Sequence, residues 1–254
     1  MIEPSMVRYV SAALYVGWTL ALLGAVQLKR PAARRYCYPF VAVVGIAVAA
    51  VGLRGAGIGT VSVGAGEVIL PQLVGDYVAY PLLFGFAAFV AGASRRYVGF
   101  VVATIAVMRA AYEGANLFDG AVGLAGTATV VGGYLLLVWL YFGPVAAAAR
   151  RQPPRRALFY RKTRNLVLFV FGILIAWAML QLFGVFDAFT QAVTLEYIDF
   201  VLRVGFAAFV IANAETLVGE GDNGDDGGGD TDAIGRVGVD TAPDSETRDA
   251  TTSD

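Results

Sequence analysis

Six ionisable side chains lie inside long apolar stretches of the 254-residue chain. They are Asp76, Arg109, Glu113, Glu196, Asp199 and Arg203. Burying such a group is costly, so each is a candidate for ion pairing, proton transfer or ligand binding. The chain has no histidine and a single cysteine, Cys37, which removes the commonest metal ligand and any intrachain disulfide. We therefore expect neither an enzyme active site nor a metal centre.

Two of these acids stand four residues from an arginine. On a helix, Asp199 and Arg203 would share one face, and so would Arg109 and Glu113. Either pair is explained by a structural salt bridge inside a helix bundle. The alternative for each is a polar site that faces a cavity and holds an ion, water or a ligand.

The elements that position these residues are membrane-spanning helices. Hydrophobic residues make up 57% of the chain and charged residues 15%, below the quarter or so that is usual in soluble domains. Runs of about 20 apolar residues are long enough to cross a bilayer. They predict an all-α membrane protein of seven helices, at about 7–28, 36–57, 72–93, 97–116, 121–149, 165–184 and 192–217. Residues 59–63 and 67–70 flank a Gly-Ala-Gly and predict a short β-hairpin between the second and third helices.

Charge in the connections predicts the orientation. Thirteen basic residues follow the first, third and fifth spans, whereas the opposite side carries only Arg8 and Arg54. The positive-inside rule then places the N-terminus outside and the C-terminus in the cytoplasm. We expect a multi-pass protein of the cell membrane, in contact with lipid and not with nucleic acid. Residues 1–217 form the membrane domain, and 218–254, with eleven acids against two arginines, form a disordered acidic cytoplasmic tail.

The last span carries a recognisable motif. Asp199-Phe-Val-Leu-Arg203-Val-Gly-Phe206 resembles the D-x-x-x-K-V-G-F signature of the microbial rhodopsin family, bacteriorhodopsin included. Leu140-Tyr-Phe-Gly143 is similar to the family's motif at the end of the fifth helix, and Pro81-Leu-Leu to its third-helix motif. The resemblance covers nearly the whole chain in helix number and loop pattern. It implies the seven-helix opsin bundle.

The family's retinal-binding lysine falls on Arg203. A Schiff base needs a primary amine that can lose a proton and attack an aldehyde. A guanidinium is delocalised and stays protonated, so Arg203 cannot form one. The two lysines, Lys29 and Lys162, are expected in loops. The sequence therefore predicts an opsin-like protein without covalent retinal, in which Arg203 pairs with one remaining carboxylate, Asp199.

Other family positions are changed as well. Aligned on Pro81, the third-helix counterion carboxylate falls on Gly75 and its tryptophan neighbour on Asp76. A shift of one residue would put Asp76 at the counterion position, and the sequence leaves this open. The proton-donor position holds Phe86, and Phe171 replaces a tryptophan of the sixth helix. The residues expected to line what is left of the pocket are Gly75, Asp76, Tyr80, Phe171 and Phe206.

Three functions are compatible with this pattern. The first is a non-photochemical sensor or adaptor that acts through partner proteins. A second is an anion channel or transporter with Arg203 in its path. The third is a photoreceptor that binds retinal or a carotenoid noncovalently. Members of the family often form trimers, so a homo-oligomer is also expected.

Overall fold

The computed structural model describes residues 4–63, 66–182 and 185–218. Within these residues it contains long helices joined by short connections, and one two-stranded sheet. The long helices are α1 (Pro4–Gln27), α2 (Pro31–Gly55), α3 (Leu70–Val90), α4 (Arg95–Leu117), α5 (Gly120–Phe142) and α7 (Pro154–Leu182). The last span comprises α8 (Ala188–Phe200), η1 (Val201–Gly205), α9 (Phe206–Asn213) and η2 (Ala214–Leu217). Apart from Val218, the predicted tail lies outside the described residues.

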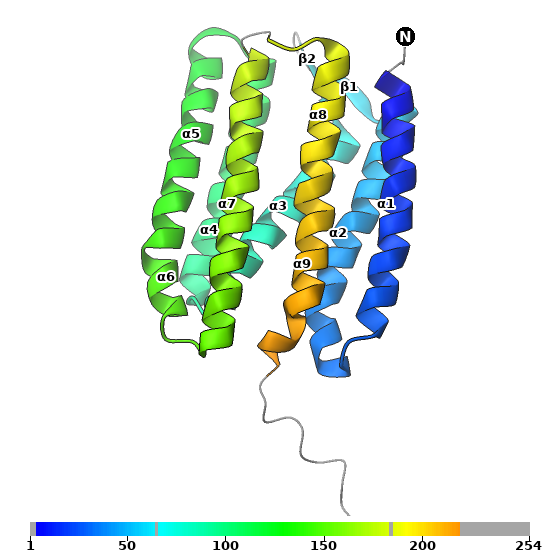
Figure 1. The fold of residues 1–254 in the computed structure, drawn as a ribbon. Coiled ribbons are helices and arrows are strands. Elements are labelled where there is room, and N and C mark those ends of the chain that lie inside the picture. The colour runs from blue at the N-terminus through cyan, green and yellow to red at the C-terminus, as the bar shows by residue number, and fades with distance from the viewer. Residues whose placement is uncertain (1–3, 64–65, 183–184, 219–254) are drawn as a thin grey trace, which may run out of the picture. The chain divides into compact units, whose positions relative to one another are not determined.

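The bundle has the predicted seven-helix architecture. Figure 1 shows the long helices side by side, with the β1–β2 hairpin at the end where α1 begins. Six helices of the described residues are long and apolar enough to cross a membrane. The seventh span is divided by η1, a segment of π-helix, but runs on as helix from Ala188 to Asn213. The predicted hairpin is confirmed: strands β1 (Thr60–Val63) and β2 (Gly66–Ile69) pair antiparallel, with Val61 opposite Val68.

Two helices begin earlier than the apolar pattern indicates. The second span starts at Pro31 rather than 36, and the sixth starts at Pro154 rather than 165. Proline suits the first turn of a helix because its missing N–H would have no helical partner there. The apolar run marks only the part of a helix that fits the hydrocarbon. Basic residues predicted in loops, such as Arg161 and Lys162, are therefore exposed on the first turns of α7.

Close backbone contact joins α4 and α5. A Cβ built on Gly126 would lie 2.6 Å from the carbonyl oxygen of Ala111, so a larger residue would push these helices apart. Small residues allow this approach, which gains dispersion energy where the hydrophobic effect is weak. Helix α5 ends just before Gly143, and the chain continues as the short helix α6 (Pro144–Ala149).

Polar side chains close the end of the bundle opposite the hairpin. The Arg156 guanidinium of α7 donates to the carbonyl oxygens of Val90 (2.9 Å) and Phe89 (3.2 Å) at the C-terminus of α3. The Tyr141 hydroxyl of α5 donates to the carbonyl oxygen of Phe84 at 2.5 Å. These bonds run between different helices and hold α3, α5 and α7 together.

Asp187 caps the N-terminus of α8 and gives a pH-dependent prediction. Its carboxylate accepts a 2.7 Å hydrogen bond from the Thr190 backbone N–H, and this bond lowers the pKa of Asp187. A carboxylate whose pKa is lower in the folded state stabilises the fold above its unfolded value of about 3.9. That stabilisation disappears as the pH falls through the folded pKa. We expect Asp187→Ala to lower the melting temperature at pH 7 and to approach wild type as the pH falls below the folded pKa of Asp187.

Thermal unfolding of wild type, Asp187→Ala and Asp187→Asn across this pH range checks the prediction. Asparagine keeps an acceptor for the Thr190 N–H without the charge, so its deficit at pH 7 should be smaller than that of alanine and should also shrink as Asp187 of the wild type is protonated. A deficit of Asp187→Ala that stays constant down to the lowest pH would argue against the charged cap.

Candidate functional site

A segment of π-helix positions Arg203. The segment η1, Val201–Gly205, interrupts the last span, and the Arg203 side chain is 3% exposed. One turn of π-helix widens the helix and reorients the side chains around it, and such turns are common at functional sites. Arg203 is thus held inside the bundle, between the helices that contact the last span.

Arg203 faces two carboxylates. Its Nε lies 2.9 Å from the Asp199 carboxylate on the preceding turn, and its Nη2 forms an ion pair with Asp76 of α3. Planar guanidinium groups suit such an arrangement because their N–H donors point in fixed directions. The expected pair of Arg203 with Asp199 is present, and Asp76, which the sequence left undecided, is a further carboxylate partner. The sequence could not decide it because Asp76 and Arg203 are 127 positions apart.

Asp76 also binds a second arginine. Arg109 of α4 donates from Nε to Asp76 Oδ2 at 3.1 Å, and its Nη2 lies 3.1 Å from the same oxygen. The Nη2 of Arg109 in turn lies 2.5 Å from Glu113. The two predicted pairs are joined through Asp76 into one network, Glu113–Arg109–Asp76–Arg203–Asp199. We call these five residues the ion-pair chain.

Two tyrosines attach further helices to the ion-pair chain. The hydroxyl of Tyr15, in α1, lies 3.4 Å from Asp199, and that of Tyr80, in α3, lies 3.3 Å from it. Both hydroxyls donate to the carboxylate. Tyr15 was not identified from the sequence, where a tyrosine in an apolar span is most simply explained by packing. The ion-pair chain and its tyrosines thus connect α1, α3, α4 and the last span.

Charge balance in the ion-pair chain is nearly complete without a ligand. Two arginines face three carboxylates, and the innermost side chains, Asp76 and Arg203, are 4% and 3% exposed. A buried charge is tolerated when its partner and hydrogen bonds are in place, and removal of one partner leaves the other uncompensated. A guanidinium also keeps its proton over the physiological pH range. The site is therefore suited to holding a fixed cation rather than to releasing a proton.

A second ion pair lies nearer the hairpin end. Arg54 at the end of α2 lies 3.4 Å from Glu196 of α8. The two residues are 142 positions apart, and nothing in their local sequence indicates the pairing. A space of about 20 Å³ separates this pair from Arg203 and Asp199, which is room for about one water molecule.

Beside the ion-pair chain lies a cavity of about 90 Å³ between α3, α4, α5, α7 and α8. Three of the predicted pocket residues, Asp76, Tyr80 and Phe171, line it. The other two lie elsewhere. A Cβ on Gly75 would sit 3.4 Å from Arg203 Nη1, so this glycine makes room for the guanidinium. Phe206, the first residue of α9, is buried and contacts Phe40 and Phe86 instead.

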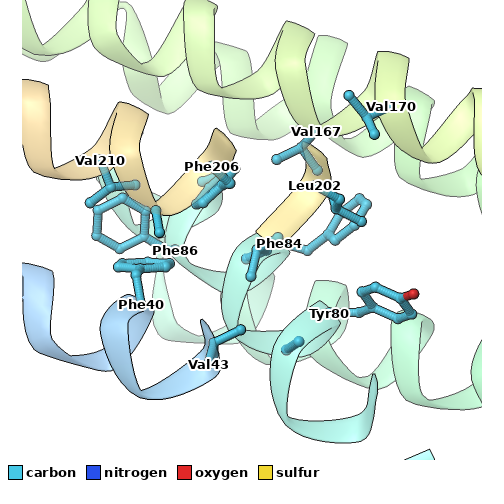
Figure 2. Packing of buried hydrophobic residues seen from close by; sticks show 14 of the residues in the cluster. Phe40, Val43, Tyr80, Phe84, Phe86, Val167, Val170, Leu202, Phe206 and Val210 are labelled. Carbon is cyan, nitrogen blue, oxygen red and sulfur yellow. The ribbon is translucent and has the colours of Figure 1, made fainter. Parts of the chain in front are cut away.

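Phenylalanine rings fill the half of the bundle away from the hairpin. Figure 2 shows Phe40, Phe86 and Phe206 packed against one another from α2, α3 and α9. The ring centroid of Phe40 lies 4.7 Å from that of Phe86 and 5.5 Å from that of Phe206. Phe159 of α7 extends the cluster, 6.3 Å from Phe86. We call these four residues the phenylalanine cluster. It offers no polar group to an ion or proton.

Aromatic contacts also occupy the space between α3 and α7. The Phe171 ring lies 4.9 Å from Phe84 and 5.9 Å from Tyr80, centroid to centroid. Phe171 and Phe84 are buried, and Tyr134 of α5 approaches Phe171 at 6.4 Å. These rings limit the cavity to its small volume. A typical pocket for a ligand of drug size has about 300 Å³ or more.

Comparisons with known proteins give a likeness in structure alone. No protein-family model matches the sequence, and no curated protein matches it. Solved structures do match. The light-driven proton pump rhodopsin of Coccomyxa subellipsoidea has a TM-score of 0.74 and 17% identity, over 84% of this chain and 98% of that one. A cyanorhodopsin from Calothrix has a TM-score of 0.77 and 16% identity, over 84% and 96%.

A thermophilic rhodopsin from Rubrobacter xylanophilus is similar to the same degree. Its TM-score is 0.74 and its identity 17%, over 85% of this chain and 97% of that chain. At these low identities, the likeness in structure shows the fold alone. The predicted microbial rhodopsin fold is therefore confirmed, and with it a multi-pass membrane protein in contact with the lipid bilayer.

Proposed function

We propose that this chain, a membrane protein with the fold of the microbial rhodopsins, works without covalent retinal, as a non-photochemical sensor or adaptor that acts through other proteins. The observation that carries the proposal is the ion pairing of Arg203 with both Asp76 and Asp199. A Schiff base cannot form on a guanidinium. Both lysines of the chain, Lys29 and Lys162, are far along the sequence from this site, before α2 and early in α7.

Light-driven proton pumping is a property of the similar rhodopsins from Coccomyxa and other sources. Two features argue against its transfer to this chain. The cation at position 203 does not change protonation near neutral pH. The phenylalanine cluster, with Phe86 at its centre and at the position expected for the proton donor, places apolar rings rather than a carboxylate in the half of the bundle away from the hairpin.

The same features weigh against an anion channel or transporter. Ions cross a membrane protein along rings of charged groups or backbone carbonyls. Arg203 is already paired on two sides, and the phenylalanine cluster, which includes Phe206 three residues further along the last span, is closely packed and apolar. A noncovalent polyene is disfavoured by the volume of about 90 Å³ in the cavity.

The position of the basic residues supports the adaptor role and the proposed orientation. The exposed residues Arg161 and Lys162 extend α7 beyond its apolar part, at the end of the bundle opposite the hairpin. By the positive-inside rule this end faces the cytoplasm, where the acidic tail would also lie. It is thus the surface on which a cytoplasmic or membrane partner would bind.

Proteoliposomes test the transport alternatives. We expect the wild-type protein, supplied with retinal, to give no light-dependent pH change and no chloride flux above protein-free liposomes. A reconstituted light-driven proton pump serves as the positive control. Arg203→Gln serves as the matched variant, since an anion path through the bundle would depend on this cation. A chloride flux in wild type that Arg203→Gln abolishes would replace the sensor hypothesis with a channel.

Cross-linking in native membranes tests the partner. We expect one protein to be recovered with the chain in stoichiometric amounts. Recovery should fall at least several-fold in Arg161→Gln/Lys162→Gln, because both side chains are exposed and the fold does not depend on them. Asp119→Asn, an exposed change before α5, is the control and should leave recovery unchanged. Absence of any stoichiometric partner would contradict the adaptor role.

A further inference from the structure

The cavity beside the ion-pair chain has two unsatisfied hydrogen-bond donors among its lining residues. Trp177 of α7 is 5% exposed, and its Nε1–H has no partner among the described residues. Arg109 of α4 has a 9% exposed side chain, and its Nη1 is likewise buried and unpartnered within the described part of the chain. A buried donor without an acceptor is costly, so such groups normally have a partner.

Two further polar side chains of the wall, Asp76 and Tyr80, are already engaged, and the wall also includes Gln72 and Tyr112. Both oxygens of Asp76 are bound by arginines, and the Tyr80 hydroxyl donates to Asp199. The rest of the wall is mainly aliphatic and aromatic, with Ile105, Leu174 and Ala178 among its residues. An occupant that satisfies the two free donors must therefore bring an acceptor atom and an otherwise apolar body.

Charge selects between a neutral and an anionic occupant. The ion-pair chain holds three carboxylates against two arginines, so its formal charge is already negative. A further anion would lie beside Asp76 in a poorly solvated space, where like charges repel strongly. A neutral acceptor avoids this repulsion and still satisfies Arg109 and Trp177.

Volume sets the size of the occupant. A cavity of about 150 Å³ binds benzene, with its six carbon atoms. A space of about 90 Å³ would by proportion hold a molecule of about four non-hydrogen atoms. Retinal and carotenoids are several times larger.

We propose that this cavity binds a small uncharged carbonyl compound, whose oxygen accepts hydrogen bonds from Trp177 Nε1 and Arg109 Nη1 and whose apolar part contacts Ala178 and Leu174. The inference rests on the proposed sensor function, because it names the class of ligand that the sensor would bind. Binding beside Asp76 would couple the ligand directly to the ion-pair chain, and so to four helices of the bundle.

The test is a titration of the full chain in lipid nanodiscs with acetone, which has four non-hydrogen atoms, followed by ligand-detected NMR, with protein-free nanodiscs subtracted. We expect saturable binding to wild type. Trp177→Phe keeps the ring and loses the donor, and should weaken binding by about two- to ten-fold. Ala178→Leu fills the cavity and should abolish saturable binding. Trp139→Phe, on the exposed face of α5, should bind like wild type.

Each remaining outcome overturns the inference. Equal affinity in wild type and Trp177→Phe would show that the donor has no role. Competition by sodium bromide would identify the occupant as an anion. Lack of saturable binding to folded wild type would leave only water as the partner of these donors. None of these results depends on pigment formation or partner capture, so the proposed function can fail or survive independently.

Discussion

Replacing Asp76 by asparagine is expected to destabilise the bundle more than any other single change in the ion-pair chain, by about 3 kcal/mol or more. Asp76 is the one residue that two arginines share, and its side chain is 4% exposed. An asparagine of the same shape offers one acceptor oxygen, and its NH₂ group would face the other guanidinium. One arginine would thus lose its partner in α3, while Asp199 and Glu113 would remain on the other side.

Thermal unfolding in detergent checks this expectation. A loss of this size corresponds to a drop of about 10 °C in the melting temperature of a domain of this length. Asp119→Asn makes the same chemical change at an exposed residue before α5, whose side chain makes no capping hydrogen bond, and should shift the melting temperature little. If Asp76→Asn melted within a degree or two of Asp119→Asn, the ion-pair chain would not contribute to stability.

The sequence was sufficient for the architecture because the relevant signals are local. Apolar runs mark the spans, and the alternation around the Gly-Ala-Gly at 64–66 predicted the strands that pair as Thr60–Val63 with Gly66–Ile69. Helix ends were predicted less well. Arg161 and Lys162 show why: α7 extends beyond the hydrocarbon layer into a polar segment, and an apolar run in the sequence marks only the part of the helix inside that layer.

The centre of the site depends on contacts that sequence does not encode locally. Gly75 and Asp76 are adjacent, and an alignment on Pro81 cannot tell which one faces the last span. In the structure both approach Arg203, the glycine by leaving space and the aspartate by ion pairing. Tyr15 and Arg109 reach the same site from other helices, and no spacing rule connects residues in different spans.

The place of Phe206 beside the π-helix could not be predicted from the sequence either. Val201–Gly205 contains no proline and no other sequence signal that distinguishes it from α-helix. Phe206 was predicted to line the pocket from its place in the family motif, three residues after Arg203. In the structure it packs against Phe40 and Phe86 instead. The pattern of side chains around such a turn follows from tertiary packing, which a single sequence does not reveal.

The second large effect concerns pigment formation. All-trans retinal is expected to give a wild-type protein with no visible absorption band beyond that of free retinal. Arg203 provides no reactive amine, and the cavity of about 90 Å³ is too small for a C20 polyene. Arg203→Lys restores the amine between Asp76 and Asp199, the two carboxylates that would stabilise a protonated Schiff base. It does not move Phe171 from its contacts with Tyr80 and Phe84.

The visible absorption spectrum of purified wild type and Arg203→Lys, each expressed with all-trans retinal, is therefore the most direct test of a fixed cation at position 203 and a filled pocket. We predict that both proteins are colourless. Colour in Arg203→Lys alone would show that the pocket opens for retinal and that the arginine is the single obstacle. A visible band in wild type would contradict the central claim, because it would require a polyene site beside a residue that cannot form a Schiff base.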